Sequence, residues 1–332
     1  MPTRVRSHTK INLGLAIGPP RPDGFHQLTT LYHTLALHEW VTVEGRAAAE
    51  TRITLSSNHP QVPTDAGNTA WRMVERCLQL LDLQAEVHIH IDKQLPVQGG
   101  LGGGSGNAVA ALIGLEHELD RRLSPPERLR VAAEIGSDVP LFLLGGAVAG
   151  VGRGEEVFPL PDIPSLACVL ALPAIGVSTA QAYKDWDSLQ SASALTLKAP
   201  SATIMRLSRS IAVAFGEPHS SGVFSKSEDR AEDPVLALVR TGIENDFERV
   251  VFPQHPFLGE IKRILVGGPD AEDAAIHAGL SGSGSALFGL YSTPAAAGAA
   301  LARLQRHGVT GLVTSTLPRS DYWRTMMVAD AG

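Results

Sequence analysis

Strand-like patterns of apolar and polar residues occupy much of the N-terminal half of the chain. Residues 86–92 alternate strictly, with three β-branched aliphatic residues on one face and two histidines and an aspartate on the other. Residues 4–16 alternate more loosely, and residues 28–43 are apolar with scattered polar positions. We expect a strand or a strand pair in 4–16, at least one strand in 28–43, and a loop between them.

Apolar residues at helical spacing predict three helices in the same half. Residues 68–82 form an amphipathic pattern, and Asn68 or Thr69 is suited to cap its start. A second helix is expected over residues 107–118. A third, shorter helix is expected over residues 125–134, which begin with two prolines.

The second half of the chain mixes strand and helix patterns. Residues 145–160 resemble a hairpin, residues 167–172 a buried strand, and a domain boundary is expected near residue 160. Further on, helix-like segments alternate with short strand-like runs, which indicates a layered α/β or α+β domain. The helix-like segments are 234–240, 257–265 and 294–307, and the strand-like runs are 285–291 and 309–316.

One loop stands out, because Gly99–Gly106 holds six glycines in eight residues. Glycine costs backbone entropy on folding, so this density needs a local reason. Successive N–H groups can curl around an anion where no Cβ intrudes, and the helix that follows offers free N–H donors at its start. The loop therefore indicates a phosphate site, with a flexible linker as the alternative.

Composition narrows the class of protein. The chain has 332 residues, 44% hydrophobic residues and a net charge of −6, which is typical of a soluble protein and argues against a nucleic-acid-binding surface. No signal peptide is evident at the N-terminus, and the longest apolar stretch is too short to cross a membrane. Cys77 and Cys168 lack metal-ligand spacing, so we expect buried free thiols and a cytoplasmic location.

Several familiar motifs are absent or incomplete. The sequence contains no P-loop motif, and the glycine-rich loop comes too late in the chain for a dinucleotide-binding fingerprint. No nucleophile-elbow serine with a clear Asp and His order is found. His88 and His90 could form a metal pair but lack a clear third ligand, so the solvated face of a strand is the favoured interpretation.

Three segments together resemble the GHMP kinase superfamily: Lys10-Ile11-Asn12, the glycine-rich loop, and the second glycine-rich stretch 279–285. The resemblance covers most of the chain, from about residue 8 to about residue 290. Its matching segments are 9–13, 21–26, 95–96, 100–105, 136–140, 152–155, 177–179 with Tyr183, 244–248 and 281–285. The segments Pro22-Asp-Gly-Phe-His26 and Gly136-Ser-Asp-Val-Pro140 narrow it to members that act on a cytidine diphosphate-linked polyol.

The resemblance implies a two-domain α+β fold. A GHMP kinase N-terminal domain, like domain 2 of ribosomal protein S5, would occupy residues 1–160 and bind the phosphates of ATP. A ferredoxin-like α/β-plait C-terminal domain would occupy residues 161–332. The implied reaction is transfer of the γ-phosphoryl group of Mg²⁺-ATP to the 2-hydroxyl of a diphosphocytidyl methylerythritol, in the non-mevalonate route to isoprenoids.

The resemblance also assigns the chemistry to individual residues. Asp138 would accept the hydroxyl proton, and Lys10 would pair with Asp138 and neutralise the transferring group. Without the resemblance, Asp138 reads as a turn or cap residue and Lys10 as a solvated strand lysine. The family's nucleotide-binding positions map to Asn68, Lys93, Pro96, Gly100, Leu101, Gly102, Gly103, Gly104, Ser105, Gly106 and Asn107. Asn68 could equally be a plain helix cap.

The acceptor would be held by a separate set of residues. Phe25 and Tyr183 would stack on the cytosine and His26 would read it, while Asn12 and Thr179 would meet the polyol or the diphosphate. Gly282 and Ser283 of the second glycine-rich stretch complete the acceptor set. The metal ligands and the oligomeric state are left open, and neither nucleic acid nor membrane is an expected partner.

Two departures from the superfamily pattern bear on the phosphate loop. Ser7-His8-Thr9 replaces the usual lead-in to Lys10, and Gly106 replaces a second serine. The loss of that hydroxyl leaves Ser105 and the backbone to contact phosphate or Mg²⁺. Two other functions stay open: a GHMP kinase for a sugar, homoserine or mevalonate-like alcohol, and a non-catalytic nucleotide sensor.

Overall fold

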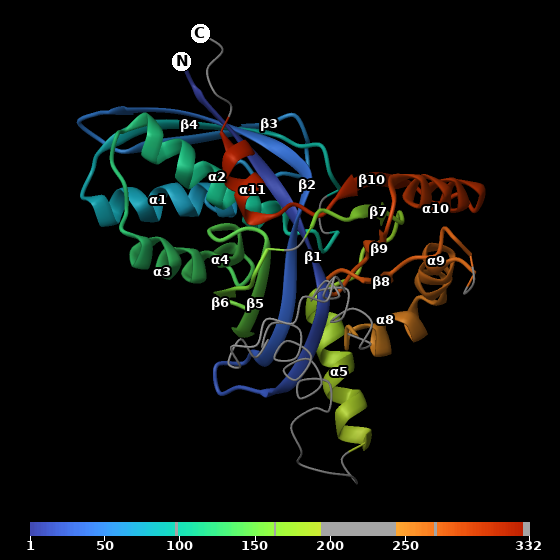
Figure 1. Ribbon diagram of the computed structural model, residues 1–332. Coiled ribbons are helices and arrows are strands. Elements are labelled where there is room, and N and C mark those ends of the chain that lie inside the picture. Colours follow the sequence, from blue (N-terminus) through green and yellow to red (C-terminus); the bar gives the residue numbers. More distant parts are fainter. Residues whose placement is uncertain (97–98, 163, 194–243, 269–270, 328–332) are drawn as a thin grey trace, which may run out of the picture. The chain divides into compact units, whose positions relative to one another are not determined.

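The computed structural model describes residues 1–96, 99–162, 164–193, 244–268 and 271–327 (Figure 1). These residues belong to two compact units, each built from segments that are distant in sequence. The first unit comprises Met1–Ile11, Tyr32–Pro159 and Ser315–Gly332, and the second comprises Asn12–Leu31 and Leu160–Thr314.

A mixed β-sheet forms the framework of the first unit. Its strands run in the order β3-β4-β2-β5-β6, and β1 pairs with β2. The parallel pairing of β3 with β4 was not predicted, although Ile53 and Leu55 alternate with polar residues. The strands are β1 (Thr3–Pro20), β2 (His26–Ala47), β3 (Arg52–Ser57), β4 (Ala85–Asp92), β5 (Ala147–Gly152) and β6 (Glu156–Pro159).

Helices α1, α2 and α3 lie on one side of β3 and β4 in Figure 1, and their apolar residues share one core with the sheet. The predicted cap of α1 is confirmed, because the Asn68 side chain accepts a hydrogen bond from the Ala70 N–H. Pro125 opens α3 as expected, behind a capping box at Ser124. The helices of this unit are α1 (Thr69–Leu81), α2 (Gly103–Glu118), α3 (Pro125–Ile135), α4 (Val139–Phe142) and α11 (Arg319–Met326).

A four-stranded sheet in the order β10-β7-β9-β8 forms the framework of the second unit. Helices α9 and α10 pack against β9 and β7, and their buried aliphatic residues form a second core. The strands are β7 (Ala167–Ala171), β8 (His277–Leu280), β9 (Leu287–Tyr291) and β10 (Gly311–Ser315). The helices are α5 (Thr179–Ser193), α8 (Glu248–Gln254), α9 (Pro256–Val266) and α10 (Pro294–Arg306).

Most of the predicted elements are confirmed. The hairpin expected at 145–160 is the antiparallel pair β5–β6, and the buried strand at 167–172 is β7. The helix pattern at 234–240 lies outside the described residues. Cys77 and Cys168 are buried free thiols, and burial raises the pKa of Cys77 to about 12. No helix within the described parts of the chain is long and apolar enough to span a bilayer.

The compact units differ from the two contiguous domains expected at 1–160 and 161–332. One boundary between the units lies at Pro159–Leu160, but Asn12–Leu31 belongs to the second unit and the C-terminal segment to the first. The reason for the second exchange is packing: Leu317 and Tyr322 lie in the core of the first unit, and the Tyr322 hydroxyl donates to the Phe142 carbonyl. Local sequence patterns do not show that a C-terminal segment packs against an N-terminal part of the chain.

Candidate active site

Two glycines give the glycine-rich loop its shape. Gly100 and Gly102 have φ values of 75° and 71°, in the left-handed region that favours glycine. Gly102 is the N-cap of α2, so the helix begins within the loop, four residues earlier than its apolar pattern indicates. The first N–H groups of an α-helix have no partner inside the helix and carry partial positive charge. The loop thus presents backbone donors at a helix start.

A cavity of about 480 Å³ opens beside these donors. All the residues predicted to bind the nucleotide line it except Gly106, and Gln61, Val62 and Pro63 form a further part of its wall. Its width at the loop depends on glycine, because a Cβ on Gly103 would lie 3.2 Å from Nζ of Lys93. The cradle fits a phosphate-bearing ligand, since it combines free N–H groups, a cation and open space.

Lys10 and Asp138 lie together next to this loop. Nζ of Lys10 is 3.3 Å from Oδ2 of Asp138, and the lysine side chain is 2% exposed whereas the aspartate is 33% exposed. The backbone N–H of Lys10 donates to the Leu101 carbonyl at 3.0 Å, so β1 is tied to the loop at this residue. A Cβ on Gly102 would meet the lysine stem at 3.0 Å, which is a second reason for glycine there.

Tyr32 is a third member of this group that the sequence analysis missed. Its hydroxyl donates to Oδ1 of Asp138 at 3.1 Å, and its ring centroid is 5.7 Å from Nζ of Lys10. Gly154 leaves room for the Tyr32 hydroxyl, because a Cβ at this position would lie 2.5 Å from the hydroxyl oxygen. Asp138 is therefore held from two sides, by a cation and by a phenol.

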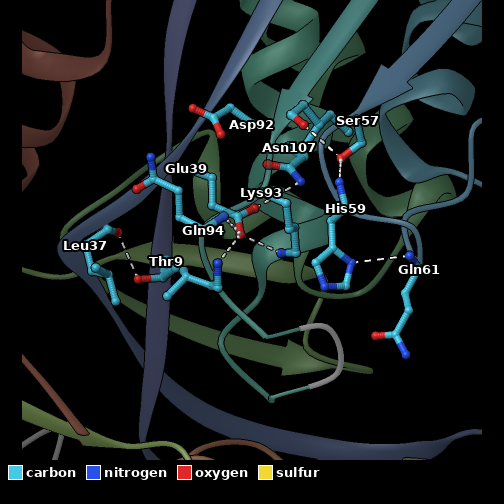
Figure 2. A network of polar contacts seen from close by, with 12 residues as sticks. Thr9, Leu37, Glu39, Ser57, His59, Gln61, Asp92, Lys93, Gln94 and Asn107 are labelled. Atoms are coloured by element: carbon cyan, nitrogen blue, oxygen red, sulfur yellow. Dashed lines mark hydrogen bonds and ion pairs between the residues drawn. The ribbon is translucent and has the colours of Figure 1, made fainter.

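Glu39 is another functional candidate that the sequence did not reveal. It is fully buried in β2, and its Oε1 lies 2.6 Å from Nζ of Lys93. Figure 2 shows this carboxylate at the centre of a polar network that also includes Asn107. Lys93 is thus one half of a buried ion pair on the cavity wall.

Asn68 and Gly106 have structural roles that can be read directly. The Asn68 amide caps α1 and donates to the Pro63 carbonyl at 2.8 Å, so both ends of the side chain hold the cavity wall in place. Gly106 is glycine because β1 passes too close: a Cβ there would lie 2.6 Å from the His8 carbonyl oxygen and 2.9 Å from Oγ of Ser7. The two departures from the superfamily pattern, at residues 7–9 and at 106, therefore face each other.

The residues predicted to hold the acceptor all lie in the second unit. The Asn12 amide donates to the Thr30 hydroxyl at 2.8 Å, and the hydroxyls of Thr179 and Ser283 are 2.7 Å apart. The second contact joins the start of α5 to the second glycine-rich stretch. Thr179 and Ser283, two of the predicted acceptor residues, thus come together from segments that are far apart in sequence.

The predicted aromatic residues are partly assembled. His26 stacks on Tyr183 with ring centroids 4.9 Å apart and planes 13° apart, and its Nε2 is 2.7 Å from Oδ1 of Asp187. Tyr183 also meets the edge of Phe247. The Phe25 ring is 49% exposed at the turn between β1 and β2. Sequence reasoning missed Asp187, which lies one helical turn after Tyr183 on α5.

The second glycine-rich stretch is held by Asn245. Its amide donates to the carbonyls of Leu280 and Gly282 at 2.8 and 2.7 Å. Glu248 of the same segment accepts the Leu280 N–H at 2.9 Å. The segment 244–248 is therefore a support for the turn that contains Gly282 and Ser283.

The predicted histidine pair on β4 makes ordinary strand contacts. His88 and His90 are half-buried, and their rings lie within hydrogen-bonding distance of hydroxyls of Thr54 and Ser56 on β3.

Comparison with known proteins assigns the chain to a family. Residues 68–146 match the model of the GHMP kinase N-terminal domain, and residues 231–310 match that of the GHMP kinase C-terminal domain. The 4-diphosphocytidyl-2-C-methyl-D-erythritol kinase of Solibacter usitatus is 38% identical over 287 residues, which cover 86% of this chain and 80% of the relative. That of Acaryochloris marina is 35% identical and covers 86% of each chain. The chain belongs to the 4-diphosphocytidyl-2-C-methyl-D-erythritol kinase family.

Solved structures agree with membership in this family. A crystal structure of a 4-(cytidine 5'-diphospho)-2C-methyl-D-erythritol kinase aligns over 94% of this chain and 98% of its own, with a TM-score of 0.67 and 25% identity. A homoserine kinase from Cytophaga hutchinsonii aligns with the same TM-score at 18% identity, which supports the shared fold. The expected GHMP kinase fold is thus confirmed. In this member of the family, the predicted nucleotide and catalytic residues lie in the first unit and the predicted acceptor residues in the second.

Proposed function

We propose that this kinase transfers the γ-phosphoryl group of ATP to the 2-hydroxyl of 4-diphosphocytidyl-2-C-methyl-D-erythritol, giving the 2-phosphate and ADP for isoprenoid precursor synthesis. The observation that carries the proposal is the Lys10–Asp138 pair beside the glycine-rich loop. A protein that only binds a nucleotide needs no more than the phosphate-binding loop. A phosphoryl transferase also needs a base and a cation at the reacting atoms, and the pair supplies both.

The geometry supports a direct transfer. As the bond between phosphorus and the 2-oxygen forms, the bond between the β,γ-bridging oxygen and phosphorus breaks, and Asp138 accepts the hydroxyl proton. Lys10, held at 3.3 Å, offers positive charge to the oxygens of the transferring group. Tyr32 fixes the orientation of the carboxylate through its 3.1 Å hydrogen bond. No covalent phosphoenzyme is required.

The proposal includes Mg²⁺ bound together with ATP, the phosphoryl donor. When bound with ATP, the ion would neutralise phosphate charge, and this chain would contribute one or two oxygens to it. The hydroxyl of Ser105 lines the cavity at the first turn of α2 and is the side-chain oxygen of the loop suited to this role. Gly106 offers no side chain, in agreement with its contact with β1.

On the acceptor side, the proposal assigns the cytidine to the aromatic group of the second unit. Tyr183 and Phe25 offer ring faces for stacking, and His26 offers a polar edge. Asn12, Thr179 and the Gly282–Ser283 turn offer amide and hydroxyl groups for the polyol and the diphosphate. The reaction is placed in the cytoplasm, in keeping with the two free thiols.

A second function within the superfamily is phosphorylation of homoserine, mevalonate or a sugar. Those acceptors contain no nucleobase, so they give the aromatic residues of the second unit nothing to stack on. The test is an acceptor panel with product identification by mass spectrometry and ³¹P NMR. We expect phosphate on the 2-oxygen of the cytidine diphosphate acceptor and a specificity constant at least about a hundredfold lower for each simple alcohol. A higher constant for any alcohol without cytidine would overturn the assignment, and ATP binding without transfer to any acceptor would indicate a sensor.

A further inference from the structure

The buried carboxylate of Glu39 lies where the apolar face of a strand is expected. In β2, Glu39, Val41 and Val43 share one face, and all three are fully buried. The register of β2 with β4 pairs Trp40 with Asp92 at the end of the ladder. Glu39 precedes Trp40 on β2, and Lys93 directly follows the last residue of β4. The two charged side chains therefore meet where the strand pairing stops.

Both carboxylate oxygens of Glu39 contact residues that line the nucleotide cavity or lie next to it. Oε1 is 2.6 Å from Nζ of Lys93 and accepts the N–H groups of Leu95 and Gln94 at 3.1 and 3.4 Å. Oε2 accepts the side-chain amide of Asn107 at 3.3 Å. Leu95 precedes the glycine-rich loop and Asn107 follows it. One carboxylate therefore joins both ends of the loop and the cation beside it (Figure 2).

The position of Lys93 makes the counter-charge of Glu39 necessary. Its Nζ lies near the first residue of α2, 3.2 Å from the place of a Cβ on Gly103. A helix N-terminus repels a cation, and Lys93 is only 7% exposed, so water gives it little help. Without a counter-charge the ammonium would leave this wall of the cavity. An ammonium has three donors, and Glu39 is its one acceptor among the described residues, so two donors remain for a ligand.

We propose that Glu39 is a positioning residue for the nucleotide: it holds the Lys93 ammonium on the cavity wall and fixes the two ends of the phosphate loop. This inference rests on the proposed binding of ATP in the cavity, but not on the identity of the acceptor. Glu39 itself does not line the cavity, so it acts on the nucleotide only through Lys93, Leu95 and Asn107.

The test is an equilibrium titration of the full-length protein with a non-hydrolysable ATP analogue, which needs no acceptor. Glu39→Gln keeps the shape of the side chain, but one of its two terminal atoms becomes a donor and cannot accept from Lys93, Leu95 or Asn107. We expect the Kd of the analogue to rise at least about tenfold. In steady-state assays the KM for ATP should rise by a similar factor while the KM for the acceptor stays within about twofold.

Glu116→Gln is the matched control. Glu116 is 4% exposed on α2, pairs with Arg128 and accepts the Leu123 N–H at 3.0 Å, and none of these residues lines the cavity. Both variants lose a buried ion pair and should lower the midpoint of thermal unfolding. We expect Glu116→Gln to leave the Kd of the analogue within about twofold of the parent value. An unchanged Kd for Glu39→Gln as well would reduce Glu39 to a structural residue and overturn the proposal.

Two further variants secure the result. Lys93→Met should weaken binding as Glu39→Gln does, and the effects of the two substitutions should combine to less than their product in the double variant, because part of the effect of Glu39 passes through the Lys93 ammonium. Multiplying effects would contradict this. If Glu39→Gln does not fold, Glu39→Asp keeps the charge but is too short to reach both Lys93 and Asn107, and a parent-like Kd for that variant would equally overturn the proposal. Binding of the analogue without any phosphoryl transfer would count against the proposed function only.

Discussion

The chain contains two glycine-rich turns of similar composition, and the structure uses them in opposite ways. The first turn runs into a helix of 16 residues and lines a cavity, so the N–H groups at the helix start face open space. In the second turn, the carbonyls of Leu280 and Gly282 are engaged by the amide of Asn245, and a strand follows. The first turn has backbone donors at a helix start beside a cavity, whereas the second turn is held in shape by side-chain contacts.

The difference lies in what surrounds each turn. Lys10, Lys93 and Asp138 bring charge to the first turn, and two of them are nearly buried. The second turn is bordered by the hydroxyls of Thr179 and Ser283, 2.7 Å apart, and by the Glu248 carboxylate, which accepts the Leu280 N–H and pairs with Lys262. We therefore propose that the transferring phosphate is bound at the first turn, and the polyol and diphosphate of the acceptor at the second. Each prediction below tests that division.

A large effect on kcat is expected for Lys10→Ala. The substitution removes the cation 3.3 Å from Asp138 and leaves the transferring group without its charge, so kcat should fall by about a hundredfold to a thousandfold. Steady-state kinetics measures the loss, and thermal unfolding shows whether the fold survives the loss of a buried side chain. Retention of more than about a third of the parent kcat would refute the role given to Lys10.

Gly106→Ser restores the hydroxyl that the superfamily pattern has at this position, and we expect it to destabilise the protein. Its Cβ would lie 2.6 Å from the His8 carbonyl, so β1 or α2 must shift, at a cost of about 1–3 kcal/mol. Chemical denaturation measures this cost. Gly104→Ser, whose Cβ would meet only the Thr69 hydroxyl at 3.5 Å, is the matched control for stability. Equal stabilities of the two variants would show that the contact with β1 does not constrain the loop.

Asn245→Ala probes the second turn. It leaves the carbonyls of Leu280 and Gly282 without their amide donor, so the turn that carries Ser283 loosens. We expect the KM for the acceptor to rise about tenfold while the KM for ATP stays within about twofold. A larger effect on ATP than on the acceptor would contradict the division between the two turns.

The smallest effect is expected for Tyr32→Phe. The variant keeps the ring but removes the hydrogen bond to Asp138, so kcat should fall about threefold to tenfold with little change in either KM. Tyr291→Phe removes a buried hydroxyl that donates to the Leu265 carbonyl in the second unit, and it should affect stability alone. Equal kcat values for Tyr32→Phe and the parent would remove Tyr32 from the site.

Local patterns in the sequence predict the local parts of this structure. The spacing of apolar residues and the Asn68 cap define α1, and two prolines and a capping box define α3. The glycine-rich loop also predicts the helix that follows it, since a helix start depends on residues close in sequence, whereas the cavity wall includes residues 61–63 and Lys93 from outside the loop. Asp138 and Lys10 became candidates through resemblance, because neither stands out by its own context.

Contacts that depend on strand register, or on segments distant in sequence packing together, could not be predicted. Glu39 looks like a polar residue on a strand until the register sets it opposite Lys93. Tyr32 reaches Asp138 across 106 positions of sequence. The segment 52–57 has a short alternation around Ile53 and Leu55, but nothing in its local sequence shows that it pairs in parallel with β4 over its full length. In each case the information lies in the pairing of distant segments.

The most direct test of phosphoryl transfer at the Lys10–Asp138 pair is a single-turnover measurement on Asp138→Asn, with the enzyme in excess over labelled ATP and with saturating acceptor. Asparagine keeps the size of the side chain but cannot accept the hydroxyl proton. We predict that the transfer rate falls by about a hundredfold to ten-thousandfold while the Kd for ATP stays within about threefold. A transfer rate within about threefold of the parent would show that Asp138 is not the base, and the proposed chemistry would be wrong.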